Sequence, residues 1–134
     1  MSNTLFCTIV TPESLALDAR ADFVALPLYD GEMGIAPDHS PLIGRLGYGE
    51  LRLRSGSQLM RYYVDGGFVQ VADNQVAIMT ARVVPANEVD AEAARTQLDK
   101  AVKRVAKTTE AREIRDRLIA QARGQLRVAR RGKL

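Results

Sequence analysis

The feature of this sequence that most constrains its fold is a change of pattern at Pro85-Ala86-Asn87. Before this point, short apolar runs rich in Val, Tyr and Phe are separated by Gly and Pro; after it, Ala, Arg, Lys, Gln and Glu predominate. The first composition favours strands and the second favours helices. We therefore predict an α+β chain, with a β-sandwich domain over residues 1–85 and an antiparallel two-helix hairpin over residues 86–134.

Charge divides the chain at the same point. Residues 1–85 carry six Arg and no Lys against nine acidic residues, a net charge of −3, whereas residues 86–134 carry thirteen Lys and Arg against seven, a net charge of +6. With 134 residues and 46% hydrophobic content, the chain can bury a core. A single cysteine and a single histidine give no disulfide and no zinc-ligand spacing, so we expect no metal.

In the first part, short apolar runs recur at hairpin spacing. We expect strands near residues 5–10, 15–28, 51–54, 59–64, 68–71 and 76–80, with turns at 47–49, 55–57, 66–67 and 73–74. Such regular short strands are typical of a sandwich or a flattened barrel. Cys7 lies in the first strand and is interpreted as a small buried apolar residue.

Residues 31–46 are the most constrained segment of the first part. Two glycines, two prolines and the only histidine, His39, fall between Gly31 and Pro41. Proline fixes φ near −65° and glycine permits positive φ, so a helix is excluded here. The apolar flanks predict short strands joined by turns, in a segment that presents a surface.

In the second part the period changes from two residues to about three and a half. One apolar stripe runs over residues 89–105 and a second over 111–129, with Lys107-Thr108-Thr109 between them. Asn87 or Asp90 would cap the first helix, and Thr108 or Thr109 the second. Both stripes are narrow and rich in alanine, so the pair buries little area and needs a partner surface.

Two short motifs allow a chemical interpretation. His39 has Ser40, Asp38 and Glu32 close in sequence, but adjacency is not the geometry of a catalytic triad. The alternative is a histidine hydrogen-bonded within a proline-rich turn. The glycine pairs lack the Lys and Ser or Thr of a phosphate-binding loop, so we predict no catalytic residue.

The basic second part also allows a different class of function. Eight Arg and Lys residues crowd the last expected helix and could neutralise phosphates. No aromatic residue follows Phe68 to stack on a base, and no recognition-helix pattern accompanies the charge. A small basic adaptor that binds nucleic acid or an acidic protein therefore stays as the alternative function.

Several motifs occur in a fixed order along the chain. They are Val10-Thr11-Pro12-Glu13, Gly31-Glu32-Met33-Gly34-Ile35, Pro41-Leu42-Ile43, Gly49-Glu50-Leu51-Arg52, Gly66-Gly67-Phe68-Val69, Asp73-Asn74-Gln75-Val76 and Gly124-Gln125-Leu126-Arg127-Val128. Together they resemble the epsilon subunit of bacterial F-type ATP synthases, over nearly the whole chain.

That resemblance implies a non-catalytic rotor-stalk subunit of a proton-translocating ATP synthase. Its sandwich would bind the gamma subunit and the ring of c subunits, and its hairpin would fold down or extend into the catalytic alpha and beta subunits and inhibit ATP hydrolysis. The chain contains no run of eighteen apolar residues. The resemblance implies a peripheral location on the cytoplasmic face of the bacterial inner membrane, with no nucleic-acid partner.

The resemblance also assigns residues. Contacts with gamma and the c-ring fall on Glu32, Met33, His39, Pro41, Leu42 and Ile43, and the inhibitory basic face on Arg115, Arg123 and Arg127. A nucleotide site in some family members would here use Asp90, Arg123 and Arg127, but Ala93 stands where the motif has arginine. We expect no cofactor, and weak or no binding of ATP.

Overall fold

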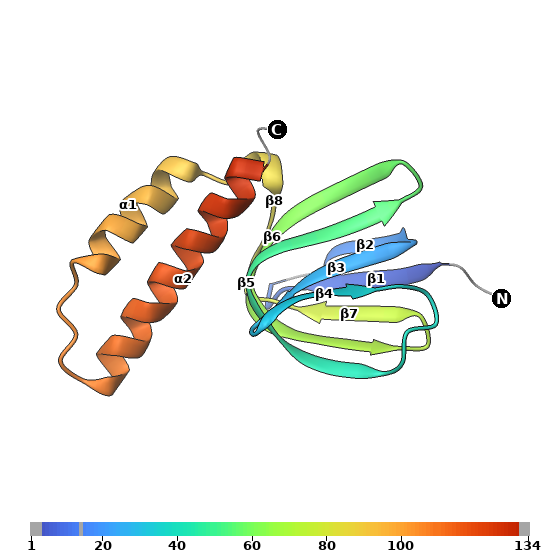
Figure 1. Cartoon of the computed structure of the whole chain (residues 1–134), viewed down its shortest axis with the longest axis horizontal. Coiled ribbons are helices and arrows are strands. Elements are labelled where there is room, and N and C mark those ends of the chain that lie inside the picture. Colours follow the sequence, from blue (N-terminus) through green and yellow to red (C-terminus); the bar gives the residue numbers. More distant parts are fainter. Residues whose placement is uncertain (1–3, 14, 132–134) are drawn as a thin grey trace.

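A computed structural model describes residues 4–13 and 15–131 of the chain. Within these residues there are eight strands and two α-helices (Figure 1). They are β1 (Leu5–Val10), β2 (Leu15–Ala21), β3 (Phe23–Leu28), β4 (Gly31–Ile35), β5 (Leu42–Ser55), β6 (Gln58–Ala72), β7 (Gln75–Met79), β8 (Val83–Pro85), a short 3₁₀ helix η1 (Ala86–Glu88), α1 (Ala91–Val102) and α2 (Thr109–Arg131). The predicted α+β class, with strands before a helical pair, is confirmed.

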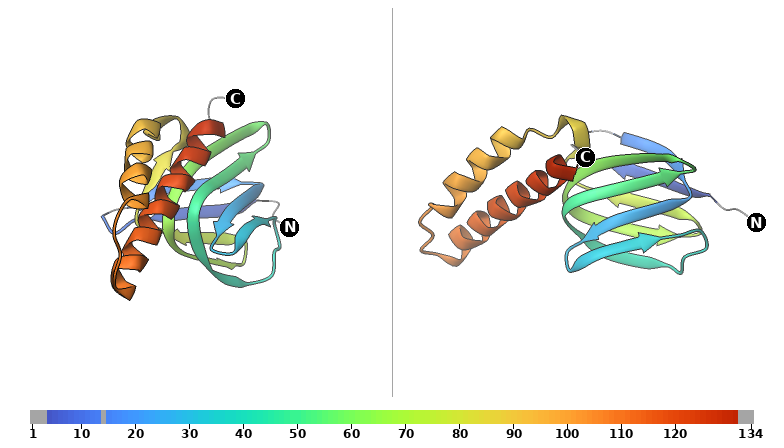
Figure 2. Two further views of the ribbon diagram at one scale, coloured as in Figure 1. Left: turned by 60° about the vertical axis from the view of Figure 1, so that its left-hand side comes forward. Right: turned by 45° about the horizontal axis from the view of Figure 1, so that its top comes forward.

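The strands form one curled sheet that folds into two layers beside the helices (Figure 2). Their order is β2-β1-β7-β6-β5-β3-β4, and β8 pairs with β6. Neighbours are antiparallel except for β1 and β7, which run parallel. The long hairpin of β5 and β6, with strands of 14 and 15 residues, connects the two halves of the sheet.

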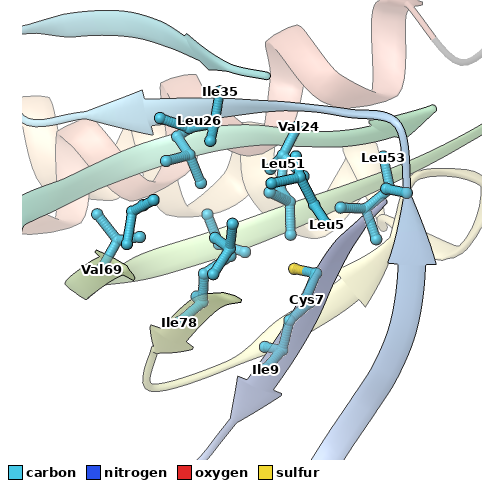
Figure 3. Packing of buried hydrophobic residues seen from close by; sticks show 14 of the residues in the cluster. Leu5, Cys7, Ile9, Val24, Leu26, Ile35, Leu51, Leu53, Val69 and Ile78 are labelled. Carbon is cyan, nitrogen blue, oxygen red and sulfur yellow. The ribbon is translucent and has the colours of Figure 1, made fainter. Parts of the chain in front are cut away.

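Alternating side chains fill the space between the layers (Figure 3). In β1, Leu5, Cys7 and Ile9 are fully buried, whereas Phe6 and Val10 are exposed. The core also contains Val24, Leu26, Ile35, Leu51, Leu53, Val69 and Ile78. Burial, with a smaller contribution from the charge of Asp18, raises the pKa of the Cys7 thiol to about 12, as expected of a buried apolar cysteine.

Two predicted turns are wrong, because their glycines lie inside strands. Gly47 and Gly49 belong to β5, where a Cβ would lie 3.0 Å from the Leu28 carbonyl oxygen and 3.1 Å from Pro27 Cβ, respectively. Glycine is needed there for close approach of strands. Strand β6 likewise continues through Gly66 and Gly67, at φ of 71° and 108°, values that other residues rarely adopt.

Residues 15–28 form two strands, β2 and β3, instead of one extended run. The constrained segment forms β4, a loop over residues 36–41 and the start of β5, as expected of short strands joined by turns. The turn at Asp73 and Asn74 is also confirmed, and both residues have positive φ, at 51° and 61°. Such a two-residue connection between β6 and β7 matches the twist of a hairpin.

Both helices begin at the expected caps. The Asp90 carboxylate accepts a hydrogen bond from the Ala93 N–H at 3.0 Å, and Thr108 Oγ1 accepts one from the Ala111 N–H at 3.0 Å. Helix α1 ends at Val102, earlier than the stripe to residue 105 predicted. None of the helices in the described ranges is long and apolar enough to cross a membrane.

The two helices differ in length, with 12 residues in α1 and 23 in α2. The last turns of α2 therefore pass the start of α1 and reach β5, β6 and η1 (Figures 1 and 2). There the buried residues are Ala122, Gly124, Gln125, Val128 and Ala129, while Leu126 of the predicted stripe is half-buried. The partner surface that the narrow stripes called for is the sandwich itself.

Candidate functional site: the outer face and the hairpin junction

A row of side chains crosses four strands of the sandwich, with exposed apolar residues on β1, β7 and β6 and Arg45 on β5. Cross-strand pairing places Val10 beside Met79, Met79 beside Phe68, and Phe68 beside Arg45. Val10, Met79 and Phe68 are 40%, 50% and 56% exposed. The Arg45 guanidinium lies 4.1 Å from the centre of the Tyr29 ring, which extends the row to the turn between β3 and β4.

A second row lies beside the first on the same side of the sheet. Ile43 of β5 is opposite Gln70 of β6, and Gln70 is opposite Ala77 of β7. Ile43 is 77% exposed. We call the surface made by Val10, Tyr29, Ile43, Arg45, Phe68, Gln70, Ala77 and Met79 the outer face. An exposed apolar row on a domain whose core is already filled is typical of a protein-binding surface.

The residues predicted to contact gamma and the c-ring do not form one surface: some lie on or beside the outer face, two are packed against the core, and Glu32 lies on the β4 edge. Ile43 lies on the outer face, and His39 and Pro41 lie in the loop before it. Met33 and Leu42 are partly buried against the core, so they hold this region in place and offer little surface to a partner. Glu32 lies on the edge strand β4, where Arg52 binds both of its carboxylate oxygens, at 2.8 and 3.0 Å.

The loop of residues 36–41 is tied to the turn between β6 and β7. The Asp38 N–H donates to Asn74 Oδ1 at 2.6 Å, and Asn74 Nδ2 donates to Asp38 Oδ1 at 3.2 Å. Asp38 has a positive φ of 65°. His39 Nδ1 lies 2.7 Å from the Ser40 carbonyl oxygen, and no carboxylate of the described residues binds its ring. The geometry is that of a turn histidine.

The second candidate site is the junction between α2 and the sandwich. A Cβ at Gly124 would lie 2.5 Å from the Tyr48 carbonyl oxygen, so helix and strand touch through their backbones. Arg127 Nη2 donates to the same oxygen at 3.4 Å. Val128 packs in a small buried cluster with Tyr63 and Ala86. These contacts hold the hairpin in a folded-down arrangement.

A buried carboxylate, that of Glu50, lies at the centre of the junction. Its side chain is 6% exposed, and its carboxylate oxygens form ion pairs with Arg61, with Arg52 at 3.0 Å and with Arg131 of α2 at 3.3 Å. Burial acts to raise the pKa of Glu50, but hydrogen bonds from Arg61 and Arg52 and the charge of Arg131 outweigh it and lower the pKa. Arg61 also donates to the Val128 carbonyl oxygen at 3.3 Å.

A polar chain lies on the other side of α2. The Tyr63 hydroxyl donates to Asp65 Oδ1 at 2.9 Å, and Gln121 Nε2 donates to Asp65 Oδ2 at 3.4 Å. Burial, with the charge of Asp65, raises the pKa of the fully buried Tyr63 hydroxyl. The hydroxyl is therefore neutral and acts as a hydrogen-bond donor beneath the helix.

The predicted nucleotide-binding set is not brought together. Arg123 and Arg127, with Arg131, line a cavity of about 500 Å³ between α2, the end of β3, the start of β4 and the middle of β5. Asp90 and Ala93 line a separate cavity of about 320 Å³ on the side of α1. The Asp90 carboxylate is also used as the cap of α1.

Two of the three arginines of the predicted basic face are exposed, and Arg115 is half-buried. Arg123 and Arg127 are exposed along the cavity edge. Arg115 lies roughly two turns earlier in α2 and is 3.5 Å from Asp116. It lines neither of the two cavities. The three arginines therefore follow the helix without forming one compact site.

Sequence reasoning missed the outer face and the Glu50 cluster. Phe68 and Met79 were assigned to strands, but the local sequence does not show which residues of other strands lie beside them. The available signal was apolar residues at both odd and even positions of β1, β6 and β7, more than one buried face requires. The Glu50 cluster joins β4, β5, β6 and α2, so no single stretch of sequence contains it.

Known proteins resemble the chain in both sequence and fold. Residues 4–86 match the family model described as ATP synthase, Delta/Epsilon chain, beta-sandwich domain. The chain is 48% identical to the ATP synthase epsilon chain of Rhodopirellula baltica, over 92% of this chain and 97% of that one. It is 34% identical to the ATP synthase epsilon chain of Rubrobacter xylanophilus, over 95% and 92% of the two chains.

Two solved structures share the fold at lower identity. A chain in the Euglena gracilis mitochondrial ATP synthase structure with OSCP, F1 and c-ring has a TM-score of 0.81 at 23% identity, covering 92% of this chain and 80% of that one. A chain in the Tetrahymena thermophila mitochondrial ATP synthase central stalk and c-ring structure has a TM-score of 0.73 at 19% identity, covering 93% and 96%.

Proposed function

The chain belongs to the ATP synthase delta/epsilon chain family, and from this premise we propose that its outer face binds gamma, its β4 edge meets the c-ring, and its hairpin controls ATP hydrolysis. It is a non-catalytic subunit of an F-type ATP synthase and associates with the membrane peripherally, through the complex. This membership replaces the alternative of a small basic adaptor.

The exposed apolar row is the observation that supports binding of gamma to the outer face. Burying Phe68, Met79 and Val10 against a partner removes apolar area from water, at about 25 cal/mol per Å². Ile43 adds to the same surface, and the loop with His39 and Pro41 borders it. A large aromatic side chain near the centre of a patch is the type of residue that dominates binding energy.

The exposed edge of β4 supports a different contact. Glu32 is a charged residue on an edge strand, with a side chain 51% exposed, and its neighbour Met33 is anchored to the core. We assign this edge to the polar loops of the c-ring. Contact with the ring would hold the subunit at the cytoplasmic face of the bacterial inner membrane.

The small docking area of α2 supports a hairpin that leaves the sandwich. Only the last turns of α2 contact the strands, and the link between the helices lies away from them (Figure 2). Once released, Arg115, Arg123 and Arg127 would meet acidic surfaces of the catalytic alpha and beta subunits. Charged rims of this kind govern association more than folding.

Copurification of the untagged chain with tagged gamma tests the outer face. Phe68→Ser should abolish recovery of the chain with gamma, because it removes the central aromatic group. Leu59→Ser is the matched control, since Leu59 is 54% exposed on the same strand but lies at its other end. Equal recovery of both variants would refute the assignment.

ATP hydrolysis by the reconstituted complex tests the basic face. Replacing Arg115, Arg123 and Arg127 by Ala should raise hydrolysis without loss of assembly. Replacing Arg112, Arg117 and Arg130, three exposed arginines of α2 outside the first set, removes the same charge and should leave hydrolysis near the wild-type rate. Unchanged hydrolysis of the first variant at low salt would exclude an electrostatic contact.

A further inference from the structure

Two arginines from different parts of the fold share one oxygen of Glu50. Arg52 Nη1 donates to Glu50 Oε1 at 3.0 Å, and Arg131 Nη1 donates to the same Oε1 at 3.3 Å. Oε2 is occupied by Arg61. Because both guanidinium groups are cationic and use one acceptor atom, a closer approach by Arg52 weakens the hold on Arg131.

Arg52 is at present divided between two carboxylates. It gives two N–H groups to Glu32, at 3.0 and 2.8 Å, and one to Glu50. The Glu32 side chain is 51% exposed and the Glu50 side chain 6% exposed, so Arg52 joins a surface carboxylate to a buried one. If Glu32 no longer binds Arg52, more N–H groups of Arg52 are therefore free to bind Glu50.

We propose that Glu32, Arg52, Glu50 and Arg131 form an ionic link through which a basic side chain that binds Glu32 loosens the end of α2. This rests on the proposed function, in which the β4 edge meets a partner and the hairpin leaves the sandwich. A guanidinium or ammonium group bound to Glu32 competes with Arg52. The released Arg52 then pairs with Glu50 and displaces Arg131.

Arg131 is the member of the cluster that leaves most easily. Its side chain is 59% exposed, against 25% for Arg52 and 18% for Arg61. Arg61 is held further by the Val128 carbonyl oxygen. The cavity of about 500 Å³ that Arg131 lines together with Glu32 and Glu50 provides space in which water can solvate the departing guanidinium.

The opposite perturbations of Glu32 and Arg52 have opposite expected effects. Glu32→Gln frees Arg52 to bind Glu50, so α2 is held more weakly. Arg52→Gln leaves Oε1 of Glu50 to Arg131 alone, so α2 is held more firmly. In a chain that already carries Arg52→Gln, no arginine connects Glu32 to Glu50, so the Glu32→Gln substitution has no further effect on α2.

Hydrogen exchange of the isolated full-length chain, followed by mass spectrometry, measures these effects. Glu32→Gln should raise exchange in residues 122–131 about two- to fivefold, the range for one partly exposed ion pair. Asp30→Asn, an equal loss of charge at the exposed turn before β4, is the control and should leave that exchange unchanged. Unchanged exchange in β1 and β7 would show that each variant is folded.

Two outcomes would overturn the link. One is equal exchange of α2 in the Glu32→Gln and Asp30→Asn chains; the other is an effect of Glu32→Gln that persists when Arg52 or Arg131 is replaced by Gln. Both are measured without gamma or the c-ring. Failure of the link is therefore separate from failure of the proposed function, which copurification with gamma and ATP hydrolysis by the reconstituted complex decide.

Discussion

Gly124→Ala should detach the hairpin from the sandwich, although alanine is the better helix residue. The added Cβ would lie 2.5 Å from the Tyr48 carbonyl oxygen and 3.2 Å from a ring carbon of Tyr63. A normal carbon–oxygen contact is about 3.3 Å, so α2 must move away by about 0.8 Å. The obstacle is backbone, which cannot rotate aside as a side chain can.

The expected magnitude follows from two opposed effects. Alanine stabilises the helix itself by about 1 kcal/mol, but it does so whether or not α2 is docked. Overpacking costs about 1 to 3 kcal/mol and acts only in the docked form. The docking equilibrium should therefore fall roughly 5- to 150-fold. The shift also lengthens the hydrogen bonds from Arg127 to Tyr48 and from Arg61 to Val128.

Hydrogen exchange of the full-length chain tests this directly. Peptides from the end of α2 and from β5 and β6 around Tyr48 and Tyr63 should exchange faster, while β1 and β7 keep their protection. Arg117→Ala, at an exposed position of α2, supplies the control without adding an atom at the junction. Wild-type or slower exchange in Gly124→Ala would refute the close-approach argument. In the reconstituted complex, the freed hairpin should lower ATP hydrolysis.

Three further predictions concern pH, domain independence and nucleotide. The pKa of Glu50 is lowered in the folded chain, so the ionised carboxylate stabilises the fold fully above the ordinary glutamate pKa of about 4.3. This stabilisation is lost as pH falls through the pKa of the folded chain. The difference in Tm between wild type and Glu50→Gln should therefore be constant from about pH 7 to 5 and shrink below about pH 4. A fragment of residues 1–88 should melt cooperatively, remain monomeric and copurify with gamma, and an unfolded fragment would contradict the boundary near residue 85. Calorimetry should detect no MgATP binding tighter than about 1 mM, with stronger binding after Ala93→Arg, whereas a micromolar affinity of the wild type would show that Ala93 is compensated elsewhere.

Patterns that depend on near neighbours could be predicted from the sequence. The alternation of Leu51-Arg52-Leu53-Arg54 indicated one buried face and one wet face, and both leucines are fully buried while Arg54 is exposed. The cap at Asp90 was visible for the same reason, since its partner is the N–H of Ala93. Such signals act within one strand or one turn of helix, where sequence distance and spatial distance agree.

Glycine marks the limit of this kind of inference. Glycine is used where φ is positive, as at Gly66, and also where another chain segment comes too close for a Cβ, as at Gly47. The sequence looks the same in both cases, and a turn was predicted at both. Gly124 in the last turns of α2 was the same signal of close approach, but its partner, Tyr48, is far away in the sequence.

The parallel pairing of β1 with β7 bears on the order in which the chain can assemble. Phe6 pairs with Gln75, so this pairing cannot form until the seventh strand is available, although β1 can pair with β2 earlier. Closing so long a loop is slow, because its entropy is lost before the pairing compensates for it. The two helices contact each other across a short link, and local structure of this kind forms in microseconds. In refolding from denaturant, the helical hairpin and the hairpin of β5 and β6 that receives it should therefore form before β1 joins β7. Closure of the sandwich by β1 would then be the last step to appear in a stopped-flow trace.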